Sequence, residues 1–395
     1  MPTRDQIVQN ARRVVVKLGT AVLLGVDGQM EPNRLDSFVA SVAELRRQGR
    51  EVLIVSSGAI GLGFRKLDLP ARPKLLPQKQ ACAAVGQGFL MALYNAALER
   101  HGLVGGQVLL TEADFDSRRR YLNLRSTVGE LLRMGVVPVI NENDTVSTLE
   151  IESRKLSHVK VNFGDNDKLS ALVASKIDAD LLLILTDVEG LYTDNPRANP
   201  EAALIPVVEA ITPKVVALAT GKGPQKGALG RGGMATKIEA ARIAGLSGCP
   251  TIVASGNVPN VIARVFAGEE LGTLFKAQAG LSGREKWIAF ATTVRGSLTV
   301  NAGARQAIVY RKGSLLPAGL LASSGEYRSG DVVGICDEAG VEFARGIANF
   351  PSEVAERICG MKSHDLDEVI GDRNFDEMVS TDNLVLHANA KEPQG

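Results

Sequence analysis

Runs of valine, isoleucine and leucine recur along this chain, and the segments that separate them are longer and have helical spacing. Strands that are apolar on both faces are typical of a parallel sheet, because the connecting helices cover both of its sides. This pattern predicts an α/β fold with a mostly parallel sheet sandwiched by helices. The expected strands are RVVVKLG, EVLIVSSG, GQVLLT, GVVPVIN, ADLLLILTD and CPTIVAS.

Helices are expected between these strands. Residues 32–49 contain apolar side chains at helical spacing and end at Gly49, a common helix stop. Their apolar face consists of Leu35, Phe38, Val42 and Leu45. Further helices are expected near 77–100, 120–134, 166–176 and 234–246.

The character of the sequence changes at AQAGLSGREK, which is small and polar. After it, short strand-like segments alternate with glycines, and AGARQAIVY has helical character. We predict a large α/β domain over 10–276, a linker over 277–285, a small mainly β domain over 286–372 and a tail over 373–395. The last segment, HANAKEPQG, is expected to be disordered.

Composition and charge limit the kinds of molecule that this protein is expected to bind. The 395 residues carry a formal net charge of +1, which argues against electrostatically driven binding to nucleic acid or membrane and favours small molecules. The 4 cysteines and 4 histidines are scattered, which indicates reduced thiols in a cytosolic protein and no metal site. The start of the chain has no apolar signal region, and runs such as LLLIL are too short to span a bilayer, so we expect a cytoplasmic protein without a membrane segment.

Polar residues follow several of the expected strands. In open sheets of this kind, ligands bind outside the carboxyl ends of the strands. Any single strand must end in a polar turn, but several polar ends at one edge of a sheet predict a cleft. These residues are Lys17, Gly19 and Thr20, then Ser56, Ser57 and Gly58, then Asn141, Glu142, Asn143 and Asp144, then Thr186 and Asp187, then Ser255, Gly256 and Asn257.

The stretch GALGRGGMATKIEAA, residues 227–241, joins glycines to a helix start. It lacks the GK[ST] of a P-loop, and its glycines do not follow a strand as those of a dinucleotide fingerprint do. Gly230, Gly232 and Gly233 would let backbone N–H groups approach an anion. An anion would also explain Lys237, a cation in the first turn of the helix. From this stretch alone, a flexible glycine-rich connection is an equal alternative.

Lys17 ends an apolar strand and precedes Gly19, so its ammonium can reach into the cleft. A lysine that only extends from a strand end toward water is the alternative. In SSGAIGLG, residues 56–63, small residues follow a strand, and their amides suit a carboxylate or a phosphate. A tight turn into a helix explains this segment as well.

The most acidic segments are INENDTV and FGDNDKLSA. Helix capping accounts for one of Asp165, Asn166 and Asp167 but not for all three. Short acidic and amide side chains opposite two lysines suit the orientation of cations and of a substrate amine. These parts suffice for phosphoryl transfer, in which catalysis is mostly positioning and charge stabilisation. Because no base is evident, the expected acceptor is a carboxylate, which is already ionised at neutral pH.

The chain resembles the glutamate 5-kinases, a branch of the amino acid kinase family, through VVVKLGT, IVSSGAIGLG, VPVINENDTV, FGDNDKLSA, LLLILTDVEGLYTDNPR and GRGGMATK, in this order. The resemblance covers 13–276, and the later segment resembles a PUA domain. It implies ATP-dependent phosphorylation of the side-chain carboxylate of L-glutamate to L-glutamyl 5-phosphate, the first step of proline biosynthesis. It also implies feedback inhibition by proline and a homo-oligomer.

The resemblance implies a role for each motif residue. Lys17 and Lys237 would be catalytic and neutralise the transferring group, with Asp167 holding both. Glutamate would be bound by Ser57, Gly58, Asp144 and Asn166, with Asp144 paired to the α-ammonium. ATP would contact Lys17, Thr186, Asp187, Arg231, Gly232, Gly233, Met234, Ala235, Thr236 and Lys237. Mg²⁺ would be carried mainly by the ATP phosphates, without a metal site of the protein.

The sequence departs from the family pattern in two places. The link LEIESRKLSHVKVN, residues 149–162, is longer than usual and basic in its middle, which could alter the proline response or assembly. Arg231 stands where a small or hydroxylated residue is expected, and it would either contact phosphate or face solvent.

The motifs are also compatible with other acceptors and with another class of function. Acetylglutamate, aspartate, carbamate and uridylate kinases share the lysine and glycine features, so the fold alone leaves the acceptor open. The GDND motif and the C-terminal domain favour glutamate. PUA domains often bind RNA, but 286–372 mixes basic and acidic residues in similar numbers, so RNA binding is not expected.

Overall fold

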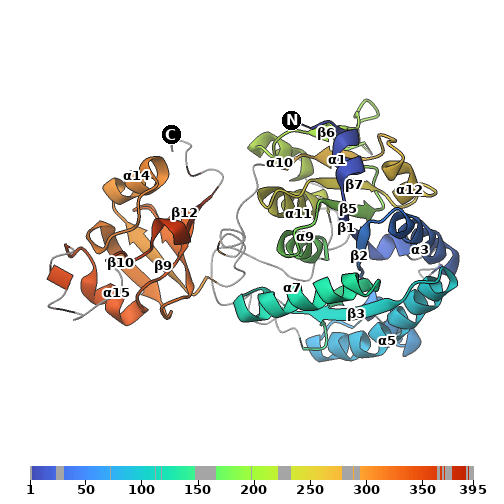
Figure 1. The fold of residues 1–395 in the computed structure, drawn as a ribbon, viewed down its shortest axis with the longest axis horizontal. Coiled ribbons are helices and arrows are strands. Elements are labelled where there is room, and N and C mark those ends of the chain that lie inside the picture. Colours follow the sequence, from blue (N-terminus) through green and yellow to red (C-terminus); the bar gives the residue numbers. More distant parts are fainter. Residues whose placement is uncertain are drawn as a thin grey trace. The chain divides into compact units, whose positions relative to one another are not determined.

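The computed structural model describes residues 2–23, 31–71, 73–111, 113–116, 118–146, 166–196, 198–220, 233–277 and 294–362, together with 288, 365–366, 369, 376–387 and 390. The chain divides into two compact units, Met1–Gly280 and Leu281–Gly395. Figure 1 shows the helices and strands of both.

The first unit is built on an 8-stranded sheet with the order β3-β4-β2-β1-β5-β7-β8-β6. All of the strands expected from the sequence are present and pair in parallel, which confirms the prediction of a mostly parallel sheet. The sequence did not predict β6 and β8, of which β8 is antiparallel to β7. The bounds are β1 (Arg13–Leu18), β2 (Glu51–Val55), β3 (Gly105–Leu110), β4 (Val137–Glu142), β5 (Leu181–Thr186), β6 (Val207–Val208), β7 (Thr251–Ser255) and β8 (Thr273–Phe275).

Helices cover both faces of this sheet (Figure 1). On one face, Val14 and Val16 of β1 share a hydrophobic core with the predicted apolar face of α3 (Pro32–Arg47). Val15 is equally buried but faces the other side, because successive side chains alternate across a strand. The first face also carries α1 (Arg4–Asn10), α5 (Leu76–Arg100) and α12 (Val261–Phe266), and the second α7 (Arg118–Arg133), α9 (Asn166–Lys176) and α11 (Met234–Leu246). The shorter helices of this unit are α2 (Thr20–Leu23), α4 (Ala59–Lys66), α6 (Ala113–Asp116) and α10 (Pro213–Thr220).

One helix of the described chain, α5, is long and apolar enough to cross a membrane, which the lengths of the apolar runs did not reveal. Half of its most apolar window, 50%, is buried inside the structure. Leu90 and Tyr94 belong to the core under the sheet. This packing is typical of a core helix, whose residues are apolar because protein surrounds them.

Helices α4 and α5 approach each other closely through two glycines. A Cβ at Gly63 would lie 1.7 Å from the carbonyl oxygen of Cys82, and a Cβ at Gly86 would lie 1.8 Å from that of Ala59. No side chain fits at these distances, so only glycine permits this contact. The contact brings the start of α4, which follows the polar end of β2, close to α5.

We expect Gly86→Ala to destabilise the first unit, because the backbones of α4 and α5 must separate to admit the methyl group. Overpacking of this kind costs about 1–3 kcal/mol of unfolding free energy. Gly88 lies two residues further along α5 and has nothing within 4 Å of its Cβ position, so Gly88→Ala is the matched control. It should stabilise the helix by about 0.5–1 kcal/mol. Thermal unfolding should therefore shift in opposite directions, and equal shifts would contradict the close contact.

The second unit contains a 5-stranded sheet with the order β10-β9-β11-β12-β13. Its strands are β9 (Gly296–Val300), β10 (Leu320–Gly325), β11 (Val332–Cys336), β12 (Glu342–Ile347) and β13 (Leu384–Leu386), and its helices include α14 (Ala302–Arg311) and α15 (Ser352–Ile358). The expected strands and the expected helix at AGARQAIVY are confirmed.

The end of this unit differs from the predicted boundary at residue 372. β13 pairs with β12, and Met378 and Val379 are buried in the core of the unit. Within HANAKEPQG, His387 donates its backbone N–H to Phe343, and Ala390 is buried. The domain thus continues into the predicted tail, because a late segment completes the edge of its sheet. Apart from Ala277, the predicted linker 277–285 lies outside the described residues.

Candidate active site

The polar strand ends meet at one edge of the first sheet, as the sequence predicted. Lys17 is in register with Val55 of β2 and with Ile184 of β5, so Ser56 lies one residue and Thr186 two residues beyond its level in the sheet. Thr186 pairs in turn with Ser255 of β7. The parallel pairing therefore brings the carboxyl ends of these strands together.

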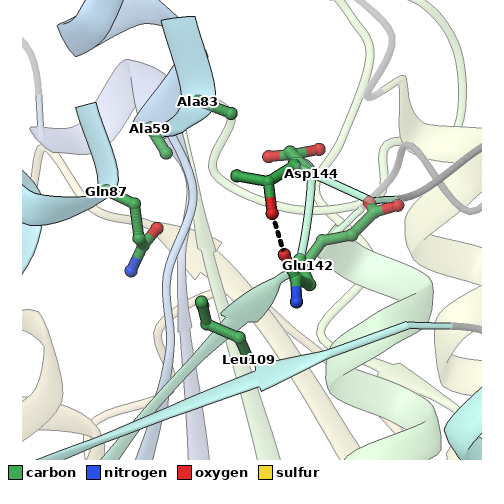
Figure 2. A pocket seen from close by; sticks show the side chains of 8 residues that line it. Ala59, Ala83, Gln87, Leu109, Glu142 and Asp144 are labelled. Atoms are coloured by element: carbon green, nitrogen blue, oxygen red, sulfur yellow. Dashed lines mark hydrogen bonds between the residues drawn. The ribbon is translucent and has the colours of Figure 1, made fainter. Parts of the chain in front are cut away.

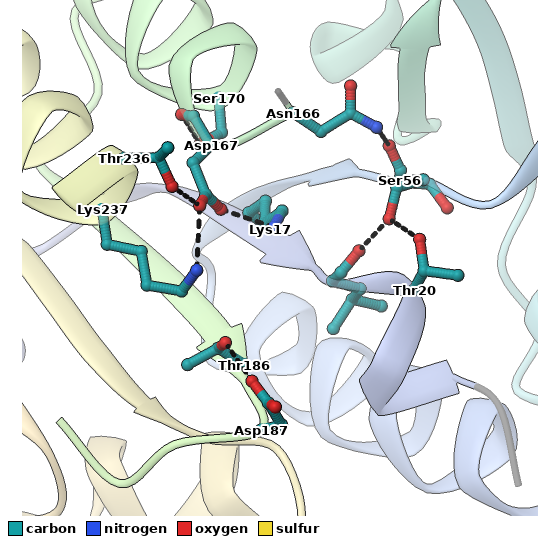
Figure 3. A network of polar contacts seen from close by, with 12 residues as sticks. Lys17, Thr20, Ser56, Asn166, Asp167, Ser170, Thr186, Asp187, Thr236 and Lys237 are labelled. Atoms are coloured by element: carbon teal, nitrogen blue, oxygen red, sulfur yellow. Dashed lines mark hydrogen bonds and ion pairs between the residues drawn. The ribbon is translucent and has the colours of Figure 1, made fainter. Parts of the chain in front are cut away.

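Asp167 lies at the centre of a buried charged cluster (Figure 3). Its Oδ1 is 2.5 Å from Lys17 Nζ, and its Oδ2 is 3.0 Å from Lys237 Nζ. Thr236 Oγ1 donates to the same Oδ2 at 3.0 Å. The three charged side chains are 8%, 0% and 3% exposed for Lys17, Asp167 and Lys237. The structure thus unites the lysines that lie 220 positions apart (17 and 237) on one carboxylate.

The carboxylate of Asp167 is held in its ionised form. Burial alone would raise its pKa, but the ammonium groups of Lys17 and Lys237 outweigh burial and bring the pKa below its ordinary value. Two lysines against one aspartate leave one positive charge in excess among these three residues. Such a preorganised positive centre stabilises phosphate oxygens.

Gly58 and Ser57 form the turn from β2 into α4. Gly58 has φ 102°, in the left-handed region, and a Cβ there would lie 3.3 Å from Thr20 Cγ2, so the turn requires glycine. Ser57 Oγ donates to the carbonyl of Leu18 at 3.1 Å. Since that uses its hydrogen, Thr20 Oγ1 is the donor in the 2.9 Å contact with Ser57 Oγ. The turn is therefore tied to the glycine loop after β1.

Asn166 is the first residue of α9 and reaches back to the strand ends. Its Nδ2 donates to the carbonyl of Ser56 at 2.7 Å and to Asn141 Oδ1 at 3.1 Å. Asn141 Nδ2 donates in turn to Gln87 Oε1 at 2.8 Å. On the other side, Ser56 Oγ contacts Tyr94 Oη at 2.9 Å, and burial raises the pKa of Tyr94. Sequence reasoning missed Gln87 and Tyr94, whose seven-residue spacing on α5 was the available signal.

Asp144 lines a pocket at the carboxyl end of β4 (Figure 2). Helix α5 contributes Ala83 and Gln87 to the wall, and α4 contributes Ala59. Leu109, Glu142, Asn143 and Thr145 complete the lining. Gln87 lines this pocket and accepts from Asn141, which in turn accepts from Asn166, so the pocket beside Asp144 is connected to Asn166 through two hydrogen bonds.

The expected nucleotide residues are placed in part. Helix α11 starts at Met234 after Gly233, which makes no side-chain cap, and Ala235 and Thr236 follow in the first turn. Thr186 ends β5 and donates to Asp187 at 3.1 Å (Figure 3). Arg231 and Gly232 lie outside the described residues, as do Asp165 and the long link 149–162.

The described residues contain no group of three or more His, Cys, Asp or Glu that could hold a metal ion. All four cysteines are free, with Cys82 and Cys249 buried and Cys336 and Cys359 half-buried. The arrangement can thus bind an anion through two lysines and a helix start, and it can bind a polar molecule beside Asp144 and Asn166.

Comparison with known proteins agrees with this division into two units. The model of the "Amino acid kinase family" matches residues 12–255, and that of the "PUA domain" matches 296–370. A glutamate 5-kinase of Caldanaerobacter subterraneus is 44% identical over 95% of this chain and 97% of its own length. A glutamate 5-kinase of Moorella thermoacetica is 45% identical over 96% and 97%, and one of Myxococcus xanthus is 46% identical over 96% and 97%.

Proposed function

This chain belongs to the amino acid kinase family and, within it, to the glutamate 5-kinases, and from that premise we propose how its residues carry out the reaction. The reaction is transfer of the γ-phosphoryl group of ATP to the side-chain carboxylate of L-glutamate. Its products are L-glutamyl 5-phosphate and ADP, and it is the first step of proline biosynthesis.

The observation that carries the proposal is the buried contact of Lys17 and Lys237 with one carboxylate, that of Asp167. Lysine side chains have many rotamers, and a shared counter-ion reduces this freedom before the nucleotide arrives. Asp167 is thus proposed to hold the two ammonium groups at a fixed separation. Their excess positive charge would then face the phosphates, together with the N–H groups at the start of α11.

The chemistry requires no base. An ionised carboxylate oxygen of glutamate attacks the γ-phosphorus, a new O–P bond forms, and the bond to the bridging oxygen of ADP breaks. No proton is transferred, because the nucleophile is already ionised at neutral pH. Lys17 and Lys237 would stabilise the charge on the transferring group and on the leaving oxygen.

The glutamate site is proposed around Ser57, Gly58, Asp144 and Asn166. Asp144 lines the pocket at the end of β4, and a carboxylate there suits the α-ammonium. The turn at Gly58 opens onto the start of α4, where backbone N–H groups suit a carboxylate. Thr186 and Asp187 would contact the nucleotide, with Arg231, Gly232, Gly233, Met234, Ala235 and Thr236.

Several finer properties are proposed on the basis of the family. Mg²⁺ would arrive on the ATP phosphates, because Asp167 is already engaged by two lysines and the described chain offers no cluster of acidic ligands. Proline would inhibit the enzyme, and the chain would act as a homo-oligomer in the cytoplasm. We propose no RNA-binding role for the second unit.

The proposed acceptor is tested by offering purified protein Mg-ATP with L-glutamate, N-acetylglutamate, aspartate or UMP. ADP release is followed, and acyl phosphate is trapped with hydroxylamine. We expect hydroxamate with L-glutamate alone and suppression by proline. The other acceptors should react at least about 100-fold more slowly, because a site with buried polar groups rejects analogues that leave those groups unpaired.

Two results would overturn the proposal in different ways. Turnover with another acceptor and none with glutamate would keep the phosphoryl-transfer site and reject the assigned substrate. No turnover with any acceptor, in protein whose thermal unfolding is raised by Mg-ATP, would reject the proposed roles of the acceptor-side residues.

A further inference from the structure

The side chains of Gln87, Asn141 and Asn166 form a chain of hydrogen-bonded amides, which we term the amide relay. It joins α5, the end of β4 and the start of α9, and it ends on the backbone carbonyl of Ser56. Gln87 is 8% exposed and Asn141 is 2% exposed. Buried amides of this kind are retained only when their hydrogen bonds are matched.

The carbonyl of Ser56 determines which atom of each amide in the relay donates and which accepts. The carbonyl of Ser56 can only accept, so Asn166 must turn its Nδ2 toward it. The same Nδ2 then requires an acceptor from Asn141, whose Oδ1 lies 3.1 Å away. Asn141 must therefore direct its own Nδ2 to Gln87, which presents Oε1 at 2.8 Å. Each hydrogen bond fixes both of its partners, so Asn141 is held between Asn166 and Gln87, and Gln87 secures the same orientation of the amides from the other end of the relay.

This direction decides what Asn166 offers to a ligand. Its two N–H groups are used by Ser56 and Asn141, and among the described residues nothing donates to its Oδ1. Figure 3 shows that oxygen pointing away from Ser56. Asn166 thus presents an acceptor. Of the groups on L-glutamate, the two carboxylates accept and only the ammonium donates.

We propose that Gln87 is a positioning residue, which fixes the amide of Asn166 through Asn141 so that Asn166 Oδ1 accepts from the ammonium of L-glutamate. This inference rests on the proposed function. Gln87 itself lines the same pocket as Asp144, the other residue assigned to the ammonium.

A second set of contacts holds Ser56, on whose carbonyl the amide relay ends. The backbone N–H of Ser56 donates to Ile140 at 2.8 Å, and the hydroxyl of Ser56 contacts Tyr94 at 2.9 Å. Tyr94 is 0% exposed and lies on the same face of α5 as Gln87. Helix α5 thus holds the relay through Gln87 and Ser56 through Tyr94, and Asn166 cannot rotate its amide without breaking a buried hydrogen bond.

The test is Gln87→Met, which keeps the length of the side chain and removes the acceptor. Asn141 then loses one of the two amide partners that hold it, and the KM for L-glutamate should rise about tenfold, equivalent to about 1.4 kcal/mol. The KM for ATP and kcat should stay within about twofold, because the lost interaction is made equally in the bound substrate and in the transition state. Gln78→Met, at an exposed position of the same helix, is the matched control.

A ligand without the ammonium separates positioning from general damage. Glutarate has both carboxylates of glutamate and no amine, so its inhibition constant against glutamate should be the same in Gln87→Met and in the parent within about twofold. Gln87→Glu supplies the rescue. At about pH 8 an ionised carboxylate still accepts from Asn141, and the glutamate KM should return to within about threefold of the parent.

The outcomes separate the two proposals. A parent enzyme that forms no hydroxamate with glutamate overturns the proposed function. With an active parent, an unchanged glutamate KM in a folded Gln87→Met variant overturns the role of Gln87 alone. An equal loss of glutarate binding, or no rescue by Gln87→Glu, also overturns it, because either result means that the substitution disturbs the whole pocket.

Discussion

Replacing Asp167 with asparagine is expected to lower the melting temperature of the protein on the order of 10 °C and to lower kcat at least about 100-fold. The substitution keeps the shape of the side chain but leaves Lys17 and Lys237 buried without a counter-charge. Removing one partner of a buried ion pair costs about 3–5 kcal/mol. The amide also turns an N–H toward one of the lysines, since only one of its two terminal atoms is an acceptor.

Mg-ATP distinguishes this electrostatic cause from a packing defect. The triphosphate replaces the missing negative charge, so it should raise the melting temperature of Asp167→Asn by more than it raises that of the parent. Asp180→Asn is the control, because Asp180 accepts two backbone N–H groups, those of Arg12 and Arg13, through one oxygen that asparagine also provides. An equal effect of Mg-ATP on parent and variant would count against the assigned role of Asp167.

The sign of the pH dependence follows from the same cluster. Burial raises the pKa of Asp167, the two lysines lower it further than burial raises it, and the net pKa lies below the ordinary value. The carboxylate therefore contributes its full stability above the pKa of the unfolded chain. That contribution is lost as the pH falls through the lower pKa of the folded protein. At neutral pH the parent should show no dependence of stability on this group.

The second large effect is expected for Lys17→Met and Lys237→Met, each of which should lower kcat by about 10² to 10³. Methionine keeps most of the apolar side chain and removes the ammonium. Stability should change little in either variant, because Asp167 still pairs with the remaining lysine and the excess positive charge disappears. Loss of turnover with an unchanged melting temperature is therefore the expected combination.

Lys214→Met is the control for this pair, because Lys214 is exposed on α10. Its turnover should equal that of the parent. A near-normal kcat in either Lys17→Met or Lys237→Met would remove that lysine from the mechanism. A variant that unfolds would show instead that the lysine is needed for the fold rather than for the transfer of phosphate.

The sequence predicted the framework of the site because the relevant signals are local. A strand that is apolar on both faces and ends in polar residues is typical of a parallel sheet. Lys17 and Thr186 lie at the ends of such strands, and Ser57 follows one. The helix start at Met234 was also readable from the glycines before it.

What the sequence could not predict depends on contacts between distant segments. The amide relay joins Gln87 to Asn141 across 54 positions, and no periodicity encodes the direction in which an amide points. The close contact of Gly63 with Cys82 could not be predicted either, because the sequence does not show whether a glycine in a helix faces another backbone or open space. Strand β13 was missed since its three residues pair only with a strand nearly 40 positions earlier.

Asn166 and Asp167 are consecutive residues at the start of α9; Asn166 belongs to the amide relay, and Asp167 contacts the lysine pair. Their Cα atoms are separated by one peptide unit, about 3.8 Å, a length that no side-chain repacking can alter. The peptide backbone therefore fixes the distance between the residue proposed to bind the acceptor, Asn166, and the residue that holds the two lysines, Asp167. No substitution can change this spacing. A change of specificity toward a longer or shorter acceptor must therefore come from residues that face α9 and not from α9 itself.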